Sequence, residues 1–411
     1  MMRLLHTADW HLGDRMGRID RTDDLRRAVE RVAKSCEEEK VDVLLIAGDL
    51  FSELSRPDSL RESIEHMQTV FEKFLLDGGT ILAITGNHDN ENFCQTLRLV
   101  MNLAAPAAGG AGEVRPPGRL YLAANPTFLR LLDRDGSPVQ FLLLPYPTPT
   151  RYLRDVQTQR YGSLDEKNRH LQSAYALKVR DFQQHPRFDP AQPTVLSAHI
   201  HVQGAQLPTL FRISEQESII FAENDLPTNL SYVALGHIHQ PHCLMEKQHV
   251  RYSGSIERLD LGERFDEKSL TVFNLGPDGV ATDIEQRPLP ATPMYDLEIF
   301  SPKDELPALA TTYPEGQRAL VRYHLHYKAS EDNLHEVLNE LDRIFPRWYQ
   351  RSWAEAGELG PALTVSGQGT GHKSFHDMVI DYLKDELSNH DDAERDGIVR
   401  LAEELIAEES A

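Results

Sequence analysis

Residues 41–49 read VDVLLIAGD, the clearest buried-strand pattern in the chain. The apolar run has the length of a strand and is too short for a typical helix. Gly48 allows a close approach of the backbone, and Asp49 follows where the strand ends. The segment therefore predicts a buried strand with a functional carboxylate at its carboxyl end.

Four other strand-like runs lead into polar groups in the same way. These runs lie at residues 4–8, 80–85, 193–198 and 231–235. The groups that follow them are Asp9-Trp10-His11, Gly86-Asn87-His88-Asp89, His199 and His237-Ile238-His239. Side chains two residues apart in an extended segment point the same way, so each Asp-x-His or His-x-His pair can bind one ion. Five such strands predict a site at the edge where a sheet stops.

The chemistry of these groups points to divalent metal ions. Carboxylate, imidazole and amide oxygen donors suffice for two divalent cations and leave one histidine unligated. Such a set predicts cleavage of a phosphate ester by a metal-activated water. A lone Gly-Asp or Asp-x-His is more often a turn or a hydrogen-bonded histidine, and Gly-Asn-His-Asp alone could be a turn. The ordered set of five after five strand signals favours the metal site.

Longer fragments around these groups resemble a known family. The fragments are HTADWHLG (6–13), AGDLF (47–51), TGNHD (85–89), GHIH (236–239) and YSGSIERLDLGE (252–263). They resemble the calcineurin-like metallophosphoesterase superfamily and, more narrowly, the SbcD-type nuclease subunits of SbcCD complexes, over residues 1 to about 275. The resemblance implies an α/β fold: a layered metallophosphoesterase β-sandwich flanked by helices, a small α+β capping domain and C-terminal partner-binding helices.

The same resemblance implies roles for individual residues. The first metal would be held by Asp9, His11, Asp49 and His239. The second would be held by Asn87, His199 and His237, with Asp49 bridging both ions. His88 would be the catalytic residue that gives a proton to the leaving oxygen. The two ions are expected to be Mn²⁺, with iron or magnesium less favoured.

One segment departs from the family pattern. Archaeal and eukaryotic relatives carry a further histidine shortly after the Gly-Asp motif, whereas this chain continues Leu50-Phe51-Ser52-Glu53. A second histidine acid is therefore absent there, and neither Ser52 nor Glu53 is assigned its role.

Length and composition bound the class of protein. The chain has 411 residues, 40% of them hydrophobic, which predicts about two or three domains with real cores. It contains no run of 18 apolar residues, and its start reads directly into the first strand, so neither a membrane helix nor a signal peptide is expected. Cys36, Cys94 and Cys243 lack paired spacing and predict reduced thiols in a cytoplasmic protein.

The net charge of −21 argues against a protein that binds DNA unaided, because phosphate contacts require Lys and Arg. Residues 371–411 alone carry 12 Asp and Glu against 4 Lys and Arg. This tail is expected to face a partner protein or solvent. Affinity for DNA is therefore expected to depend on a partner.

Breaks in pattern predict four regions: a nuclease domain at 1–285, a capping domain at 286–354, a linker at 355–372 and a helical segment at 373–411. Helices are expected at 20–39, 57–77, 91–103 and 167–183. The capping domain is expected to contain strands at 295–300 and 319–327 and a helix at 333–344. His324 and His326 mimic a metal pair, but no carboxylate motif lies nearby, so a role facing solvent or DNA is favoured.

Two regions predict contacts with other chains. Helix 91–103 has more apolar residues than one buried face needs, which predicts a homodimer; the alternative is that all of them pack inside their own chain. These residues are Phe93, Leu97, Val100, Met101 and Leu103. Two amphipathic helices within 373–411 cannot bury their apolar faces alone. These helices are expected to dock either on their own chain or, as the resemblance implies, on an SbcC-type ABC ATPase.

The sequence therefore predicts a two-metal exonuclease and endonuclease. It would act on double-stranded ends, hairpins and single strands of DNA during double-strand-break repair, together with the ATPase. The alternative enzyme is a phosphodiesterase or phosphatase that acts on a small or protein substrate. A scaffold that only anchors the ATPase would be expected to lose metal ligands, and all seven are present.

Overall fold

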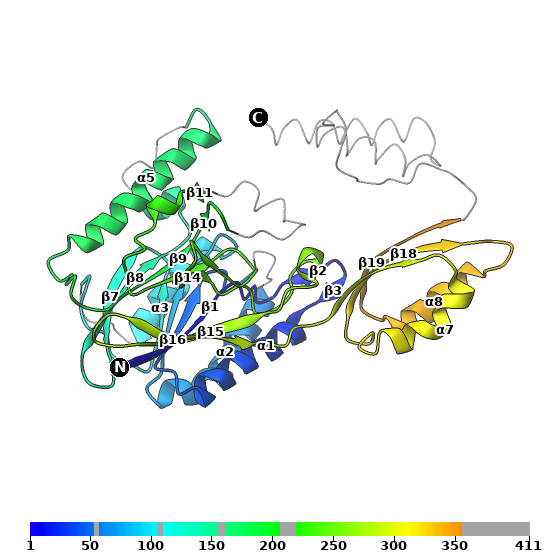
Figure 1. Cartoon of the computed structure of the whole chain (residues 1–411), viewed down its shortest axis with the longest axis horizontal. Coiled ribbons are helices and arrows are strands. Elements are labelled where there is room, and N and C mark those ends of the chain that lie inside the picture. Colours follow the sequence, from blue (N-terminus) through cyan, green and yellow to red (C-terminus); the bar gives the residue numbers. More distant parts are fainter. Residues whose placement is uncertain (53–56, 105–109, 154–160, 206–218, 356–411) are drawn as a thin grey trace. The chain divides into compact units, whose positions relative to one another are not determined.

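The computed structural model describes residues 1–52, 57–104, 110–153, 161–205 and 219–355 (Figure 1). The chain divides into one unit of residues 1–356 and a second of residues 357–411. The second unit lies outside the described residues, and so do the predicted helical segment and all but the first residue of the predicted linker. Both the linker and the helical segment stay predictions.

The first sheet has six strands in the order β16-β15-β1-β4-β5-β6. They are β16 (Ala281–Pro288), β15 (Ser269–Leu275), β1 (Met2–Thr7), β4 (Val43–Ala47), β5 (Thr80–Ile84) and β6 (Leu120–Ala123). Strands β1, β4, β5 and β6 run parallel to one another. Strand β15 pairs antiparallel with β1, and β16 pairs antiparallel with β15. The carboxyl ends of β1, β4 and β5 therefore lie at one end of the sheet.

The second sheet also has six strands, in the order β13-β14-β12-β9-β8-β7. They are β13 (His242–Leu244), β14 (Lys247–Tyr252), β12 (Tyr232–Gly236), β9 (Thr194–His199), β8 (Pro138–Leu144) and β7 (Thr127–Leu132). The central strands β14, β12, β9 and β8 are parallel, with β13 and β7 antiparallel at the edges.

The two sheets face each other, and alternating side chains of each strand explain the packing. Val43 and Leu45 of β4 belong to the core between the sheets, together with Val195 of β9. Leu44 and Ile46 point to the other face and pack under helices. Strands buried on both faces read as continuous apolar runs, which is why VLLIA shows no alternation.

Helices cover the outer faces of the sandwich (Figure 1). Helices α1 (Thr22–Glu38), α2 (Pro57–Leu76) and α3 (Glu91–Ala104) contribute to the core on the first sheet. Helix α5 (Leu164–Gln183) contributes to the core on the second. The shorter elements are β2 (Arg15–Met16), β3 (Ile19–Asp20), α4 (Pro149–Tyr152), β10 (His201–Val202), β11 (Ile220–Phe221), η2 (Glu223–Asp225) and η3 (Leu261–Glu263). The expected layered α/β sandwich is confirmed.

A separate three-stranded parallel sheet, β17-β18-β19, follows the sandwich. Its elements are β17 (Met294–Ile299), α7 (Pro302–Thr312), β18 (Leu320–Tyr327), α8 (Leu334–Ile344) and β19 (Trp348–Glu355). Residues of both helices, such as Leu309 and Leu341, join the core on one face of this sheet. We call residues 294–355 the βαβαβ unit.

The sequence predicted only two strands and one helix in this unit. Helix α7 was missed because Pro307 lies inside it, and a proline interrupts a helical pattern. Strand β19 was missed because most of its side chains are exposed and give no apolar alternation.

Polar contacts join the βαβαβ unit to the sandwich. Asp24 of α1 is buried and forms ion pairs with Arg21 and with Arg347 just before β19. The guanidinium of Arg18 lies 3.8 Å from the ring centroid of Trp348. A buried carboxylate needs such partners, because an unpaired charge away from water is strongly unfavourable.

Cys36, Cys94 and Cys243 are free thiols. Among the described residues, no helix combines the length and apolarity needed to cross a membrane.

Candidate metal centre

The polar groups predicted from sequence come together, but they extend from two sheets and not from one edge of a single sheet. Asp9, Asp49 and Asn87 follow strands of the first sheet, whereas His199 and His237 come from β9 and β12 of the second. The parallel strands of each sheet end on the same side, and the two sheets face each other. The cluster therefore spans the gap at one end of the sandwich.

The Asp49 carboxylate lies at the middle of the cluster. One oxygen, Oδ2, is 3.2 Å from Nε2 of His199 and 3.5 Å from Nε2 of His11. The other, Oδ1, accepts a hydrogen bond of 2.9 Å from the backbone N–H of His88. A single carboxylate thus contacts histidines contributed by both sheets.

Two groups of candidate ligands flank Asp49. On one side, Asp9, His11 and His239 offer ligand atoms that all lie within 4.8 Å of one another. On the other side, Asn87 Oδ1 is 2.9 Å from His199 Nε2 and 3.0 Å from His237 Nδ1. The structure therefore brings together all seven residues that the sequence proposed as ligands.

The backbone at the cluster is held in unusual conformations. Positive φ angles occur at Asp9 (54°), His11 (46°), Asp49 (49°) and His237 (95°), four of the eight such non-glycine residues in the described part of the chain. Residues other than glycine rarely adopt positive φ angles, and backbone strain of this kind concentrates at functional sites.

Two glycines make room for the ligands. Gly48 has a φ of 97°, and a Cβ there would lie 2.1 Å from Nδ1 of His199. A Cβ at Gly86 would lie 2.0 Å from Oδ1 of Asp49. The glycine of each motif therefore serves close approach, as the sequence predicted for Gly48.

Outer partners fix the orientation of two imidazoles. The Nδ1 atom of His199 is 2.8 Å from the carbonyl oxygen of Ala47. The Nδ1 atom of His239 is 2.7 Å from Oε1 of Glu263, whose other oxygen accepts a hydrogen bond of 2.7 Å from Lys268. Carboxylates and carbonyls behind a ligating imidazole set its tautomer and orient its free nitrogen toward a metal.

Sequence reasoning missed the role of Glu263. Glu263 is the last residue of the fragment YSGSIERLDLGE, so the sequence did contain a signal for it. Its pairing with His239 was not evident, because the two residues are 24 positions apart in the sequence. Burial opposes ionisation of Glu263, yet attraction to Lys268 and His239 outweighs it and holds its pKa below the usual value.

Asp89 is a second residue whose role was missed. Its buried carboxylate accepts hydrogen bonds from the backbone N–H groups of Gly86, Leu50 and Phe51. It therefore joins the loop after β5 to the loop after β4. The loops that carry Asn87 and Asp49 are held together by this carboxylate.

The electrostatics of the cluster favour a bound cation. Burial raises the pKa of the Asp9 carboxyl to about 6. Burial disfavours the charged form of His199, but the nearby Asp49 carboxylate outweighs it and raises the pKa of His199 to about 9. Burial also lowers the pKa of His237 well below its usual value. Carboxylates and imidazoles crowded away from water are a donor set that fits divalent ions.

His88 lies inside the cluster, next to the ligands. Its side chain is only 4% exposed, and its ring centroid is 4.9 Å from that of His11. Its ligand atoms also lie within 4.8 Å of those of His11 and Asp49. Proximity alone would thus permit ligation as well as the proton-donor role that the resemblance implies.

Ser52 lies three residues after Asp49. Its buried hydroxyl donates a hydrogen bond of 3.3 Å to the carboxylate of Asp14. Glu53 lies outside the described residues. The contact with Asp14 gives Ser52 a structural role.

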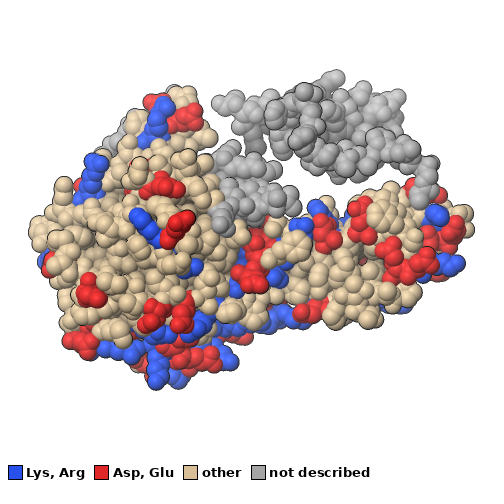
Figure 2. Space-filling model, in the orientation of Figure 1, with Lys and Arg blue, Asp and Glu red and all other residues tan. Residues whose placement is uncertain are grey.

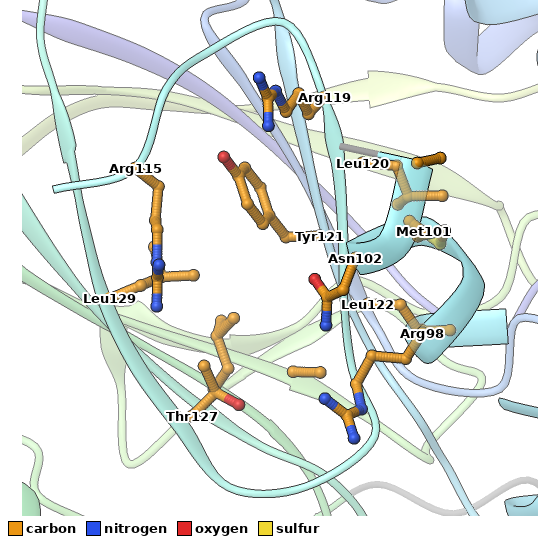
Figure 3. Close-up of a pocket in the computed structure, with 13 residues that line it drawn as sticks. Arg98, Met101, Asn102, Arg115, Arg119, Leu120, Tyr121, Leu122, Thr127 and Leu129 are labelled. Atoms are coloured by element: carbon orange, nitrogen blue, oxygen red, sulfur yellow. The ribbon is translucent and has the colours of Figure 1, made fainter. Parts of the chain in front are cut away.

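Two cavities lie in different places relative to the cluster. A cavity of about 300 Å³ is lined by residues 86–91, Thr148 and Arg151, and so adjoins Asn87 and His88. Another, of about 530 Å³, is lined by Arg98, Arg115, Arg119 and Tyr121 among others (Figure 3). None of the seven ligands lines this larger cavity, so it is not part of the metal centre.

Comparison with known proteins agrees with this geometry. Residues 2–241 match the family described as calcineurin-like phosphoesterase. The SbcD subunit of the nuclease SbcCD of Bacillus subtilis (strain 168) is 30% identical over 292 residues, which cover 68% of this chain and 68% of that protein. The corresponding SbcD subunit of Escherichia coli (strain K12) is 27% identical over 310 residues, covering 71% and 69%.

Two solved structures are similar to this chain. One is a dimetal phosphatase from Danio rerio, with a TM-score of 0.40, 10% identity and coverage of 71% of this chain and 97% of that chain. The other is TT1561 of Thermus thermophilus, with a TM-score of 0.38, 13% identity and coverage of 70% and 99%.

Replacing Glu263 by glutamine should weaken metal binding without unfolding the protein. The amide keeps the shape of the side chain but removes the charge that orients His239, and such outer partners are worth about 10–100-fold in affinity. The measurement is the Mn²⁺ concentration that half-saturates the protein. Glu267→Gln, an exposed position four residues along, is the matched control. Equal affinities in Glu263→Gln and the control would contradict the role of Glu263.

Proposed function

Because the chain belongs to the calcineurin-like phosphoesterases and, within them, to the family of SbcD-type nucleases, it is a metal-dependent phosphodiesterase, and we propose that its substrate is DNA. The observation that carries the proposal is the position of Asp49 between the Asp9–His11–His239 group and the Asn87–His199–His237 group. One carboxylate between two sets of donors is the arrangement that a two-metal phosphodiesterase requires.

The residues of the cluster divide naturally between two ions. Asp9, His11, Asp49 and His239 would hold one ion, and Asn87, His199 and His237 the other, with Asp49 bridging. When bound, the ions would activate a water and neutralise charge on the phosphate oxygens. The mixture of carboxylate, amide and imidazole donors favours Mn²⁺.

We assign proton donation to His88. Hydrolysis of a phosphodiester releases a sugar oxygen that must gain a proton, and an imidazole is suited to give it near neutral pH. His88 lies at the cavity that adjoins Asn87, and its backbone N–H donates a hydrogen bond to Asp49, which fixes its position relative to that carboxylate.

A polymeric substrate is favoured by the surface beside the cluster. A cavity of about 520 Å³ is lined by residues 14–17, residues 259–261, Arg322, Tyr349 and Gln350. It therefore extends from the loop of Asp14, which contacts Ser52, to the βαβαβ unit. We propose that residues 286–354 act as a capping domain that helps to select DNA along this cavity.

A partner protein would supply much of the affinity for DNA. The net charge of the chain is −21, and on the face shown in Figure 2 the described Lys and Arg side chains lie among Asp and Glu side chains. The relatives are named as subunits of SbcCD. We propose an SbcC-type ATPase as the partner, bound through residues 373–411, and DNA-break and hairpin processing by the assembly in the cytoplasm.

We further propose a homodimer through α2 and α3. Phe93, Leu97 and Met101 of α3 are partly buried against the core of their own chain, and Leu97 and Met101 also line a cavity at this surface. Other apolar residues of α2 and α3 are exposed: Leu76 of α2, and Leu99, Val100 and Leu103 of α3. Between α2 and α3 lies a cavity of about 260 Å³ with an almost wholly apolar lining. A second copy would cover this surface.

Replacing His88 by alanine should lower DNA cleavage by about 10²–10⁴-fold while both metals are retained. A phosphodiester with p-nitrophenol as leaving group should be affected much less, because that group departs without a proton. The measurements are metal content and cleavage rates on single-stranded DNA and on the p-nitrophenyl diester. Loss of metal would assign His88 to ligation instead. Hydrolysis of phosphomonoesters but not of DNA by the wild-type protein would favour the phosphatase alternative.

Replacing Leu103 by aspartate should convert the dimer to a folded monomer. Leu103 is 83% exposed, so the change is not expected to disturb the fold of one chain. The mass in solution by light scattering is the measurement. Leu177→Asp on α5, an exposed leucine outside this surface, should leave the dimer intact. A dimer that persists in the Leu103 variant would exclude this interface.

Replacing Leu383 or Leu405 by aspartate should abolish association with the ATPase but not metal binding. Each change places a charge within an apolar stripe that would lie in a groove of the partner. Removal of the residues after Ser366 should have the same effect. Co-purification with the ATPase is the measurement. Retention of the truncated chain at normal stoichiometry would show that the tail packs on its own chain.

A further inference from the structure

A second group of metal-ligating side chains lies on the βαβαβ unit. His324 and His326 are two residues apart on β18 and share one face of its sheet. On the neighbouring strand β17, Glu298 lies directly opposite His324 in the parallel register. The intervening side chain, Leu325, points to the opposite face, into the core beneath α7 and α8.

The three side chains are close enough to share an ion. Their ligand atoms all lie within 4.8 Å of one another, and Nε2 of His326 is 3.1 Å from Oε1 of Glu298. The two imidazole centroids are 4.5 Å apart. The side chains are accessible, with exposures of 57% for Glu298 and 27% for His326. An ion could therefore reach them without a rearrangement of the sheet.

Both imidazoles have an outer partner that sets their orientation. The Nδ1 atom of His324 is 2.7 Å from the hydroxyl oxygen of Ser352 on β19, which leaves Nε2 as the donor atom for an ion. The ring of Phe300 stacks on His326, with centroids 4.7 Å apart and an interplanar angle of 7°. A hydrogen bond to the second ring nitrogen, such as that of His324, is typical of metal-ligating imidazoles.

This geometry overturns the premise of the sequence prediction for the pair. The sequence shows no carboxylate motif near His324 and His326, but pairing of β17 with β18 brings in Glu298 from 28 residues before His326. The missing carboxylate is therefore supplied by the fold.

We propose that Glu298, His324 and His326 bind one Zn²⁺ ion, with its remaining coordination open to solvent. Two histidines and one glutamate form a donor set that zinc uses with a water as fourth ligand. Imidazole donors favour Zn²⁺ over Mn²⁺ and Mg²⁺. The ion would cross-link β17 to β18. The proposal does not depend on the function assigned to that cluster.

The test compares zinc content in the full-length protein. The wild type and His326→Asn are first saturated with Mn²⁺, then equilibrated with Zn²⁺, desalted and analysed for zinc per chain. The variant should bind one Zn²⁺ fewer, with a loss of affinity greater than the about 10–100-fold that an outer partner is worth. Zinc that replaces manganese in the catalytic cluster contributes equally to both proteins, so the difference reports the new site.

Two further variants make the result decisive. His335→Asn removes an exposed histidine of α8 outside the group and should bind as much zinc as the wild type. Glu298→Gln keeps the shape of an exposed side chain and should also lose the ion, so the test stands even if His326→Asn folds poorly. With Co²⁺ in place of Zn²⁺, the visible d–d absorption of the wild type should exceed that of both site variants, because Co²⁺ in the catalytic cluster contributes equally to all three proteins. Equal zinc content in the wild type, His326→Asn and Glu298→Gln would overturn the proposal, and so would an equal loss in His335→Asn.

Discussion

The burial of the Asp9 and Asp49 carboxylates in one cluster is the constraint on which the rest of the structure depends. Both side chains are almost fully removed from water and lie among the imidazoles of His11, His199 and His239. Buried charges are strongly unfavourable unless they are paired, hydrogen-bonded or bound to a metal. Divalent ions bound at this place would stabilise both carboxylates, and the same ions would provide the chemistry of phosphodiester hydrolysis.

The sandwich holds this unfavourable arrangement in place. Parallel strands of both sheets end at the cluster, and each strand is anchored by apolar side chains on its two faces. The tight turns after β1 and β4 place Asp9, His11 and Asp49 in left-handed backbone conformations, which only a well-packed surrounding structure can maintain. Asp89 and the Glu263–Lys268 pair then fix the loops and the His239 ring. Precision at the site is therefore obtained from rigid strand ends and from hydrogen bonds behind the ligands.

The metal centre accounts for only a small part of the acidity of the chain. Asp9 and Asp49 contribute to the formal charge of −21 and would be neutralised locally by bound ions. The remaining acidity still disfavours binding of DNA by this chain alone, which agrees with its proposed place in a larger assembly. The proposed zinc site on the βαβαβ unit would add positive charge to the unit that we assign to DNA selection.

The sequence by itself located the five strands that lead to the cluster and the seven residues proposed as ligands, in their order along the chain. Each motif consists of an apolar run followed at once by its polar residues, so both the strand and its ligands are encoded within about ten neighbouring residues, as in VDVLLIAGD. Only the tertiary structure decided which strands share a sheet, and thus that Asn87 of one sheet meets His199 and His237 of the other. It also decided that Glu263 supports His239, that Glu298 faces His324, and which leucines of α3 remain exposed. The physical reason is that periodicity reports on a single element, whereas contacts between distant residues depend on strand register and helix packing, which the local sequence does not specify.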